Sequence, residues 1–224
     1  MDEQERWYAD NIALRGQVIA DVGANVGRLS QFFWDAAQGT SRVVSIEPLP
    51  ENVAVIRERI RAAGADRWSI EHCAVSARKG SIGLAVSRTA DGEWNSAVTA
   101  GKSARTVACR PLSALVPEAT VVKLDIEGHE YAVIEEAVSR LARAHTWAVE
   151  LHMMPGHPLQ LVLGAFMAEG FRVFTPSRSA QGAWTSVEVS ATLDWADIPA
   201  TRTRRDGTAF KMLHIIATRE IAAP

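Results

Sequence analysis

Acidic and imidazole side chains end two apolar stretches in the second half of the chain. Asp125 ends the stretch 120–125, and Glu150 and His152 end the stretch 146–152. Because side chains alternate along a strand, Glu150 and His152 share one face. Such groups can deprotonate a hydroxyl or hold a divalent cation that makes the hydroxyl more acidic. Asp125 and His152 are therefore candidate catalytic residues, and each of Asp125, Glu150 and His152 is a candidate metal ligand.

Each of these acidic residues also has a structural interpretation. Asp125 could cap the helix that follows it, and Glu150 could pair with Lys123. Glu127 and Glu130 fall at the start of the same predicted helix, where carboxylates interact favourably with the helix dipole. The residue types alone do not separate these roles from catalysis.

Three further kinds of side chain are open to two interpretations. His129 is either a general base, since its ordinary pKa of about 6.5 suits neutral pH, or an exposed residue in a first helical turn. His157 is a candidate for the rim of a pocket. Trp94 and Trp184 could stack on a substrate ring or simply pack against the protein.

A second region of chemical interest is the decapeptide Val-Ile-Ala-Asp-Val-Gly-Ala-Asn-Val-Gly at residues 18–27. An apolar run ends there in an acid and two glycines, which predicts a strand entering a tight turn. Glycine tolerates a positive φ and allows a ligand to approach the backbone, so Gly23 and Gly27 predict a loop shaped around a ligand. The middle glycine of the dinucleotide fingerprint is missing, and no Gly-Lys-Ser/Thr triplet occurs. The sequence therefore disfavours NAD, flavin and P-loop nucleotides.

Glu47 lies twenty positions after Gly27, in the segment Ser-Ile-Glu-Pro that ends the second predicted strand. A carboxylate at this position can accept hydrogen bonds from both hydroxyls of a ribose. Asp21 would repel a phosphate and suits a ligand with a cationic sulfonium or ammonium group. S-adenosylmethionine combines a ribose, a sulfonium and the absence of a diphosphate.

The elements that position these residues alternate between apolar strands and amphipathic helices. This alternation predicts an α/β fold with a mostly parallel sheet and helices on both faces, in a single domain covering 1–224 with an N-terminal helical extension at 1–16. Helices are expected within 29–39, 50–64, 131–141 and 159–170 from the spacing of their apolar residues. Strands are expected at 17–22, 43–47, 68–75, 120–125, 146–152, 171–175 and 210–218.

Two regions interrupt the alternation. Residues 76–119 contain short alternating stretches at 81–86 and 106–110, which predict a small β insertion between the third and fourth strands. Residues 176–209 are polar and irregular, with one strand expected at 186–191, and form a candidate substrate-side segment. For Arg202, Arg204 and Arg205, near the end of this segment, a solvated loop is the simpler interpretation than a contact to phosphate or substrate.

Composition excludes several classes of protein. The 224 residues are 47% apolar and 22% charged with a net charge of −2, so no basic surface for nucleic acid is expected. Cys73 and Cys109 match no metal or redox spacing and fit buried thiols in a reducing compartment. The acidic start and the lack of a long apolar run predict a cytoplasmic protein with no membrane partner. The oligomeric state stays open, with a homodimer among the alternatives.

Taken together, four motifs resemble the FkbM-type family of class I S-adenosylmethionine-dependent methyltransferases. The resemblance covers about residues 15–152, and its most distinctive part is the block Val-Lys-Leu-Asp-Ile-Glu-Gly-His-Glu. One departure is His129, where the family often has a small residue. The motifs lie at 21–27, at 46–48 with Asn52, at 73–76 and at 122–130.

The resemblance implies a Rossmann-like sheet of seven strands, the last one antiparallel, and methyl transfer to an oxygen of a small molecule such as a sugar or secondary metabolite. It makes the fourth and fifth strands neighbours, so Asp125, Glu150 and His152 would converge beside the methyl group. The loop from Asp125 to His129 would face the acceptor, and Mg²⁺ is a conceivable second cofactor. The predicted donor-binding residues are Asp21, Gly23, Asn25, Gly27, Glu47, Pro48, Ala74 and Asp125.

Two other classes of function remain open from the sequence. A nucleotide-dependent oxidoreductase or epimerase would share the fold class, and a non-catalytic nucleoside-binding partner would share the pocket. Within the methyltransferases, N-methylation is a variant of the main hypothesis, whereas RNA modification is disfavoured by the lack of basic charge.

Overall fold

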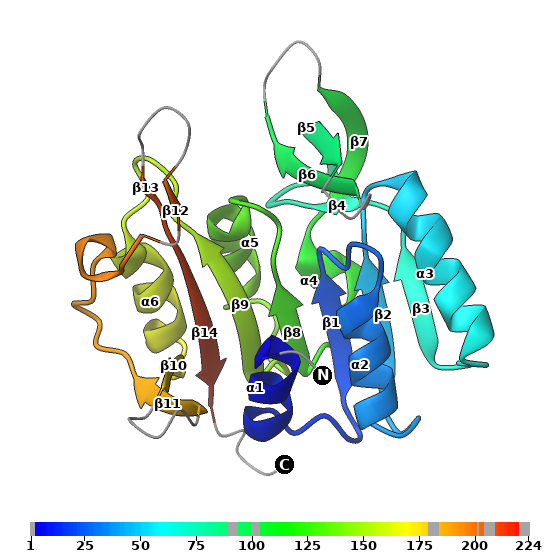
Figure 1. Ribbon diagram of the computed structural model, residues 1–224, viewed down its shortest axis with the longest axis horizontal. Coiled ribbons are helices and arrows are strands. Elements are labelled where there is room, and N and C mark those ends of the chain that lie inside the picture. Colours follow the sequence, from blue (N-terminus) through cyan, green and yellow to red (C-terminus); the bar gives the residue numbers. More distant parts are fainter. Residues whose placement is uncertain are drawn as a thin grey trace.

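A computed structural model describes residues 3–88, 94–99, 104–178, 184–200, 202–203 and 209–219. The chain folds into an eight-stranded sheet with helices on both faces, and a smaller sheet lies beyond the carboxyl ends of its parallel strands (Figure 1). The strand order of the large sheet is β11-β10-β14-β9-β8-β1-β2-β3. The predicted α/β fold is therefore confirmed.

The centre of the sheet is parallel and buried on both faces. β1 (Val18–Val22) pairs with β2 (Arg42–Ile46) on one side and with β8 (Val121–Leu124) on the other, and β3 (Trp68–Glu71) follows β2. All four residues of β8 are buried. Doubly covered strands of this kind explain the nearly continuous apolar runs in the sequence.

The other half of the sheet contains the antiparallel strands. β14 (Met212–Thr218) lies between β9 (Thr146–His152) and β10 (Arg172–Arg178) and is antiparallel to both, as expected for the last strand. β11 (Trp184–Glu188) adds an antiparallel edge strand to β10. The prediction of seven strands is thus corrected to eight, because the strand expected at 186–191 joins the main sheet.

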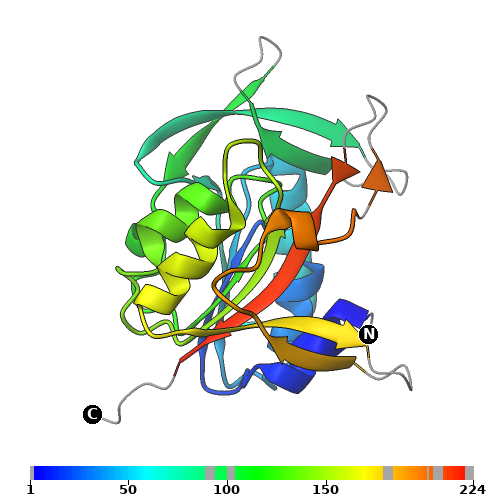
Figure 2. The ribbon, with the colours of Figure 1, turned by 90° about the vertical axis from the view of Figure 1, so that its left-hand side faces the viewer.

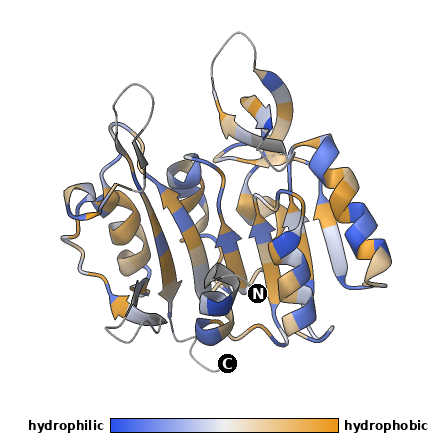
Figure 3. Cartoon of the chain, viewed as in Figure 1, coloured by the Kyte–Doolittle hydropathy of each residue, from blue (hydrophilic) through white to orange (hydrophobic). Residues whose placement is uncertain are grey.

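Helices cover both faces of the sheet, as Figure 2 shows. One face packs against the first three helices through Tyr8, Phe33 and Ile56, and the other packs against the next three through residues such as Ile134 and Phe166. Polar and apolar residues alternate along α2 and α3, as expected for helices with one buried side (Figure 3). The helices are α1 (Glu3–Asn11), α2 (Arg28–Ala36), α3 (Pro50–Ala62), α4 (Leu112–Leu115), α5 (Glu130–Ala137) and α6 (Leu159–Ala168).

The predicted β insertion forms the second sheet, in the order β4-β7-β5-β6, above the carboxyl ends of β1, β2 and β3 (Figure 1). The strand expected at 68–75 is corrected: it divides into β3, which pairs with β2, and β4, which pairs with β7. Arg105 forms two hydrogen bonds to Glu51 of α3 and so ties this sheet to the main body. Its strands are β4 (Ala74–Val75), β5 (Gly80–Arg88), β6 (Trp94–Val98) and β7 (Arg105–Arg110).

Short elements complete the described chain. The single-turn helix η1 (Trp195–Asp197) and the pair β12 (Arg202–Thr203) and β13 (Ala209–Phe210) precede β14. The β12–β13 pair lies at the same end of the main sheet as the insertion, beyond the carboxyl ends of the parallel strands (Figure 1). In the part of the chain that the structure describes, no helix has the length and apolarity needed to cross a membrane.

Candidate functional site

The loop after β1 has the left-handed backbone that its glycines predicted. Gly23, Asn25 and Gly27 have φ values of 76°, 50° and 79°. A Cβ on Gly23 would lie 1.8 Å from the backbone oxygen of Asp125, and a Cβ on Gly27 would lie 2.9 Å from Ile56. Both glycines therefore allow the loop to pack closely against α3 and the segment after β8, a structural reason for them that stands beside the predicted contact with a ligand.

Backbone amides of this loop turn toward protein acceptors. The N–H groups of Gly23 and Ala24 both donate to the carbonyl of Ile46, that of Asn25 donates to Glu47, and that of Gly27 donates to Ala24. A phosphate-binding loop needs such N–H groups free to point at the anion. These four groups are already satisfied, which agrees with the absence of a dinucleotide fingerprint.

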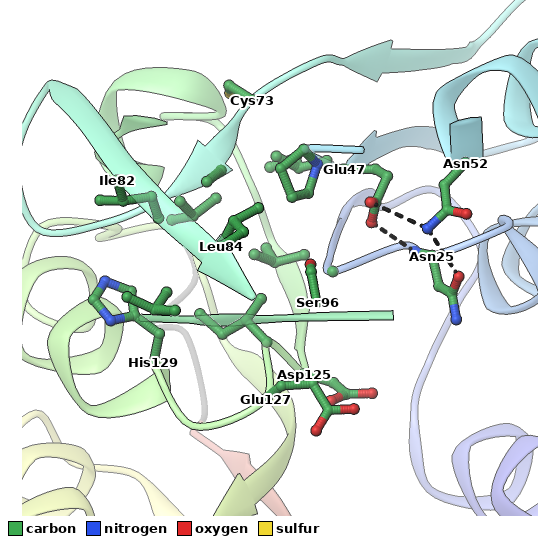
Figure 4. Close-up of a pocket in the computed structure, with 18 residues that line it drawn as sticks. Asn25, Glu47, Asn52, Cys73, Ile82, Leu84, Ser96, Asp125, Glu127 and His129 are labelled. Carbon is green, nitrogen blue, oxygen red and sulfur yellow. Dashed lines mark hydrogen bonds between the residues drawn. The ribbon is translucent and has the colours of Figure 1, made fainter. Parts of the chain in front are cut away.

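A cavity lies between this loop and the insertion, at the carboxyl ends of β1, β2 and β8 (Figure 4). The cavity is partly open to solvent, and both polar and apolar side chains line it. Six of the predicted donor-binding residues line it, namely Gly23, Asn25, Glu47, Pro48, Ala74 and Asp125.

Glu47 lines the cavity and is almost completely buried. Its carboxylate accepts hydrogen bonds from the backbone of Asn25 and Leu49, at 3.0 and 2.9 Å, and from the side-chain amide of Asn52 at 3.3 Å. A carboxylate has about four acceptor sites, so about one remains for a ligand. We therefore expect Glu47 to accept a hydrogen bond from one ribose hydroxyl, and not from both as the sequence analysis predicted.

Asp21 lies behind the loop and does not line the cavity. Its carboxylate is fully buried, accepts a hydrogen bond of 2.5 Å from Ser30 of α2, and lies 3.4 Å from the ammonium of Lys123. Lys123 also donates to the carbonyl of Gly23. The prediction that Asp21 meets a cationic ligand is corrected, because Lys123 already neutralises it. Gly27 likewise lies outside the cavity wall.

Four ionisable side chains gather at the carboxyl ends of β8 and β9. One ligand atom each of Asp125, Glu127 and His152 lies within 4.8 Å of the others. Glu150 joins them, since one of its oxygens lies 3.6 Å from Nε2 of His152. The predicted neighbourhood of Asp125, Glu150 and His152 is therefore present in the structure, and Glu127 belongs to it as well. This group of four residues is called the β8–β9 cluster below.

Glu130 supports the β8–β9 cluster through hydrogen bonds to His152 and to the loop that carries Glu127. One oxygen of this fully buried carboxylate accepts hydrogen bonds from the backbone N–H of Ile126, the backbone N–H of Gly128 and Nδ1 of His152, each at 3.0 Å. Its role is thus more specific than an interaction with the helix dipole. Asp125 does not cap α5, because the N-cap residue is His129 without a side-chain cap.

The surroundings shift the protonation equilibria of the cluster. Burial raises the pKa of Glu150 to about 7, and neighbouring Asp125 adds to the shift. Burial also raises the pKa of Asp125. Burial alone would lower the pKa of His152, but the hydrogen bond to Glu130 and the nearby carboxylates outweigh it and raise the pKa to about 9. His152 therefore carries a proton at neutral pH, and Glu150 is the group suited to accept one.

His129 lines the cavity on the side of the insertion, away from Asp125 and Glu127 (Figure 4). Its Nε2 is hydrogen bonded to Ser76 Oγ at 3.0 Å, and burial lowers its pKa. The structure thus separates His129 from the predicted catalytic partners Asp125 and His152. His157 is also elsewhere: its ring packs against Tyr131 at 4.8 Å, in a groove between α5 and α6.

The insertion supplies cavity residues that the sequence analysis missed. Ile82 and Leu84 of β5 alternate toward the cavity, and so do Ser96 and Val98 of β6. The signal was the alternating pattern of β5, which predicted the strand but not the surface that it covers. Asn52, quoted only as part of a motif, also lines the cavity.

The remaining predictions concern the two cysteines, two tryptophans and the arginines near residue 204. Cys73 and Cys109 are buried free thiols, as expected. The side chains of Trp94, Trp184 and Arg202 lie outside the part of the chain that the structure describes, as do the residues 204–205 with the other two arginines.

Comparison with protein families gives a match. The model of the methyltransferase FkbM domain matches residues 21–173, which include the loop after β1, Glu47 and the whole β8–β9 cluster. A comparison with curated proteins gives no match.

Solved structures of methyltransferases share this fold. A precorrin-6y C5,15-methyltransferase from Geobacter metallireducens has 11% identity and a TM-score of 0.53, with 97% of this chain and 87% of that chain covered. A SAM-dependent O-methyltransferase from Thermotoga maritima has 13% identity and a TM-score of 0.52, with 99% and 66% covered.

A methyltransferase FkbM from Methylobacillus flagellatus is similar over part of its length. It has 15% identity and a TM-score of 0.49, with 76% of this chain covered. The chain spans 42% of the length of that protein.

Proposed function

The chain belongs to the FkbM methyltransferase family, and we propose that it transfers a methyl group from S-adenosylmethionine to a hydroxyl of a small molecule. The observation that carries the proposal is one cavity whose walls combine Glu47, a loop with four amides already bonded to protein acceptors, and the carboxylates of Asp125 and Glu127. Family membership also favours methyl transfer over the oxidoreductase and epimerase hypotheses.

The residues of the cavity fit the parts of the donor. Glu47 has one acceptor site left for a ribose hydroxyl. Apolar side chains including Ile46, Pro48 and Ala74 offer a slot for the adenine ring, and the wall at Gly23 and Asp125 suits the methionine end. When bound, S-adenosylmethionine supplies a methyl group that the sulfonium has already activated, so the new bond to oxygen forms as the carbon–sulfur bond breaks and its electrons return to sulfur.

The acceptor would lie at the carboxyl ends of β8 and β9, where Asp125 and Glu127 border the cavity. Alignment of the acceptor oxygen with the methyl group can supply much of the acceleration, up to roughly 7–11 kcal/mol. The proton of the acceptor hydroxyl would pass to Glu150, which is 16% exposed. Glu150 lies beside Asp125, because the preceding residues Leu124 and Val149 are register partners in β8 and β9. Because the cluster is rich in carboxylates, a neutral hydroxylated acceptor suits it better than a phosphorylated one.

Donor binding is predicted to depend on pH through Glu47. Burial raises the pKa of Glu47 to about 7, against the opposing effect of its hydrogen bonds to Leu49, Asn52 and Asn25. The ionised carboxylate is the better acceptor for a ribose hydroxyl, and at pH 6 only about a tenth of the groups would be ionised. The affinity for S-adenosylhomocysteine should therefore rise about tenfold from pH 6 to pH 8, as measured by calorimetric titration.

A Glu47→Gln variant provides the control for this pH dependence. Its affinity should be weaker and should change little between pH 6 and pH 8, because the amide does not titrate. An equally steep pH dependence in wild type and variant would show that another group is responsible.

The choice of oxygen as acceptor is tested with matched compounds. Methyl-labelled S-adenosylmethionine is incubated with the protein and with neutral polyols, phenols and their amino analogues, and products are identified by mass spectrometry. The proposal predicts methyl ethers, and Glu150→Gln should lower kcat by about 100-fold or more while leaving donor affinity unchanged. Transfer to amines alone would indicate an N-methyltransferase, and tight donor binding without any transfer would favour a non-catalytic partner.

A further inference from the structure

We propose that Lys123 is a positioning residue of the donor site, because its ammonium holds the carboxylate of Asp125 against the loop after β1. The proposal rests on the proposed function, since Gly23 and Asp125 form the wall assigned above to the methionine end of the donor. Lys123 itself is buried and does not line the cavity, so it acts through the residues that it contacts.

The ammonium of Lys123 lies among three acceptors from different segments. It donates to the carbonyl oxygen of Gly23 at 3.1 Å. It also lies 3.4 Å from Oδ1 of Asp21 and 3.6 Å from Oδ2 of Asp125. An ammonium has three N–H donors, so one is available for each of these acceptors. One side chain thus connects the end of β1, the loop that follows it and the residue that follows β8.

The sheet brings these groups together. Asp21 and Lys123 are register partners in the parallel strands β1 and β8. Lys123 and Asp125 are two residues apart, so strand alternation places their side chains on the same face. The backbone of Gly23 also packs directly on Asp125, since a Cβ at Gly23 would lie 1.8 Å from the carbonyl oxygen of Asp125. This backbone contact and the ammonium hold the loop and Asp125 together at the cavity wall.

Asp21 belongs to a chain of buried hydrogen bonds that crosses the sheet. Its carboxylate accepts a hydrogen bond from Ser30 of α2 at 2.5 Å, and Oγ of Ser30 lies 2.6 Å from Oγ of Ser45 in β2. Ser45 also accepts from the indole of Trp68 at 2.8 Å. The side chains of Asp21, Ser30 and Ser45 are completely buried. Asp21 is therefore held in place by other groups, and it can in turn hold the ammonium of Lys123.

Stability alone does not account for the buried charges of this pair. Taking a lysine and an aspartate out of water is costly, and apolar side chains of similar size often stabilise a core as well or better. Burial would lower the pKa of Lys123, but Asp21 and Asp125 outweigh it and raise the pKa, so the ammonium keeps its charge at neutral pH. What the charged pair adds to an apolar core is a directional hold on Asp125.

A fixed Asp125 matters to the donor. Asp125 and Gly23 both line the cavity. A carbonyl oxygen has two lone pairs and a carboxylate has about four acceptor sites, so both groups can accept from a ligand while they face Lys123. The methionine portion of the donor ends in an ammonium group, which can donate to both. Without Lys123 the partly exposed carboxylate of Asp125 would turn freely, and donor binding would have to order it.

The test removes both buried charges at once in the full chain. Asp21→Asn/Lys123→Met keeps an acceptor for Ser30 and the volume of the lysine stem, so it should unfold at about the urea concentration of the wild type. Its affinity for S-adenosylhomocysteine in calorimetric titration should fall about tenfold or more, and kcat should fall as well. The control Glu188→Gln/Arg172→Met removes an exposed ion pair between β10 and β11, away from the cavity, and should bind as the wild type does.

A cycle of variants shows whether Lys123 acts through Asp125. Asp125→Ala alone should weaken the binding of S-adenosylhomocysteine. Adding Asp21→Asn/Lys123→Met to it should weaken binding by no more than about twofold further, because the side chain that Lys123 positions is already gone. A role of Lys123 that is independent of Asp125 would multiply the two losses instead.

Ser30→Ala is a smaller change that tests the same connection if the charge-free variant does not fold. It releases Asp21 at the end away from Lys123. It should weaken the binding of S-adenosylhomocysteine by about threefold in the wild-type chain and should have no effect in the Asp125→Ala chain.

The outcomes separate this inference from the proposed function. Wild-type affinity and kcat in a folded Asp21→Asn/Lys123→Met variant would overturn the role of Lys123 while the methyltransferase proposal stands. Equal losses from Ser30→Ala with and without Asp125 would overturn it in the same way. If the wild type itself does not bind S-adenosylhomocysteine, the proposed donor site is refuted and this inference falls with it.

Discussion

Replacing Glu130 by alanine is expected to lower the free energy of unfolding by about 3–5 kcal/mol and to abolish methyl transfer. The carboxylate is fully buried and holds three donors at once: the backbone N–H groups of Ile126 and Gly128 and the ring of His152. Its removal leaves these donors buried without their acceptor. The loop that carries Asp125 and Glu127 would lose its shape, so activity should fall with stability.

The pH dependence of this loss identifies the part due to His152. Because the folded-state pKa of His152 is raised to about 9, its stabilising contribution is fully present below about 6.5 and is lost as the pH rises toward 9. The difference between wild type and Glu130→Ala should therefore be larger at pH 6 than at pH 9. Urea unfolding at both pH values measures it.

The matched control is Glu135→Ala, on the exposed side of the same helix. It should change the free energy of unfolding by less than about 0.5 kcal/mol. Equal unfolding curves for the two variants would contradict the assignment of Glu130 as the residue that holds the β8–β9 cluster.

Replacing Glu47 by alanine is expected to weaken donor binding by about 100-fold or more. A hydrogen bond to a charged group contributes about 1.5–3 kcal/mol, and the variant also loses the acceptor that orders the backbone at Asn25 and Leu49. Glu71→Ala is the matched control, since Glu71 ends the neighbouring strand β3 outside the cavity. In calorimetric titrations with S-adenosylhomocysteine, Glu71→Ala should bind with the affinity of the wild type, whereas Glu47→Ala should bind more weakly.

The main strands could be predicted because strands that are buried on both faces consist almost entirely of apolar residues. β1, β8 and β9 are nearly continuous apolar runs, since helices cover both of their faces. The division of the stretch 68–75 was not predicted, because its two parts are both partly apolar and differ only in their hydrogen-bonding partners, β2 and β7. The hydropathy pattern does not show which neighbouring strand a strand pairs with.

Side-chain direction limited the prediction of the site. Asp21 is next to the loop in sequence, but strand alternation points it toward Ser30 of α2 and away from the cavity. His129 is near Asp125 in sequence, yet it turns to Ser76 of the insertion. In both cases the deciding partner lies in a distant segment, which spacing within a motif does not reveal.

Residues at strand ends were predicted with more success. Asp125, Glu150 and His152 meet because parallel neighbouring strands end at the same edge of the sheet and their side chains alternate in register. The contribution of Glu127 was not predicted, because it depends on a loop residue with a φ of 56° whose position is set by the hydrogen bonds of Glu130. Loop geometry of this kind follows from tertiary contacts.

The most direct test of the donor assignment is a calorimetric titration of the wild-type protein with S-adenosylmethionine and, separately, with NAD. The cavity, the loop amides bonded to protein acceptors and the remaining acceptor capacity of Glu47 predict binding of S-adenosylmethionine at one site with a micromolar Kd. They predict no binding of NAD at the same concentration. Binding of NAD without binding of S-adenosylmethionine would contradict the account.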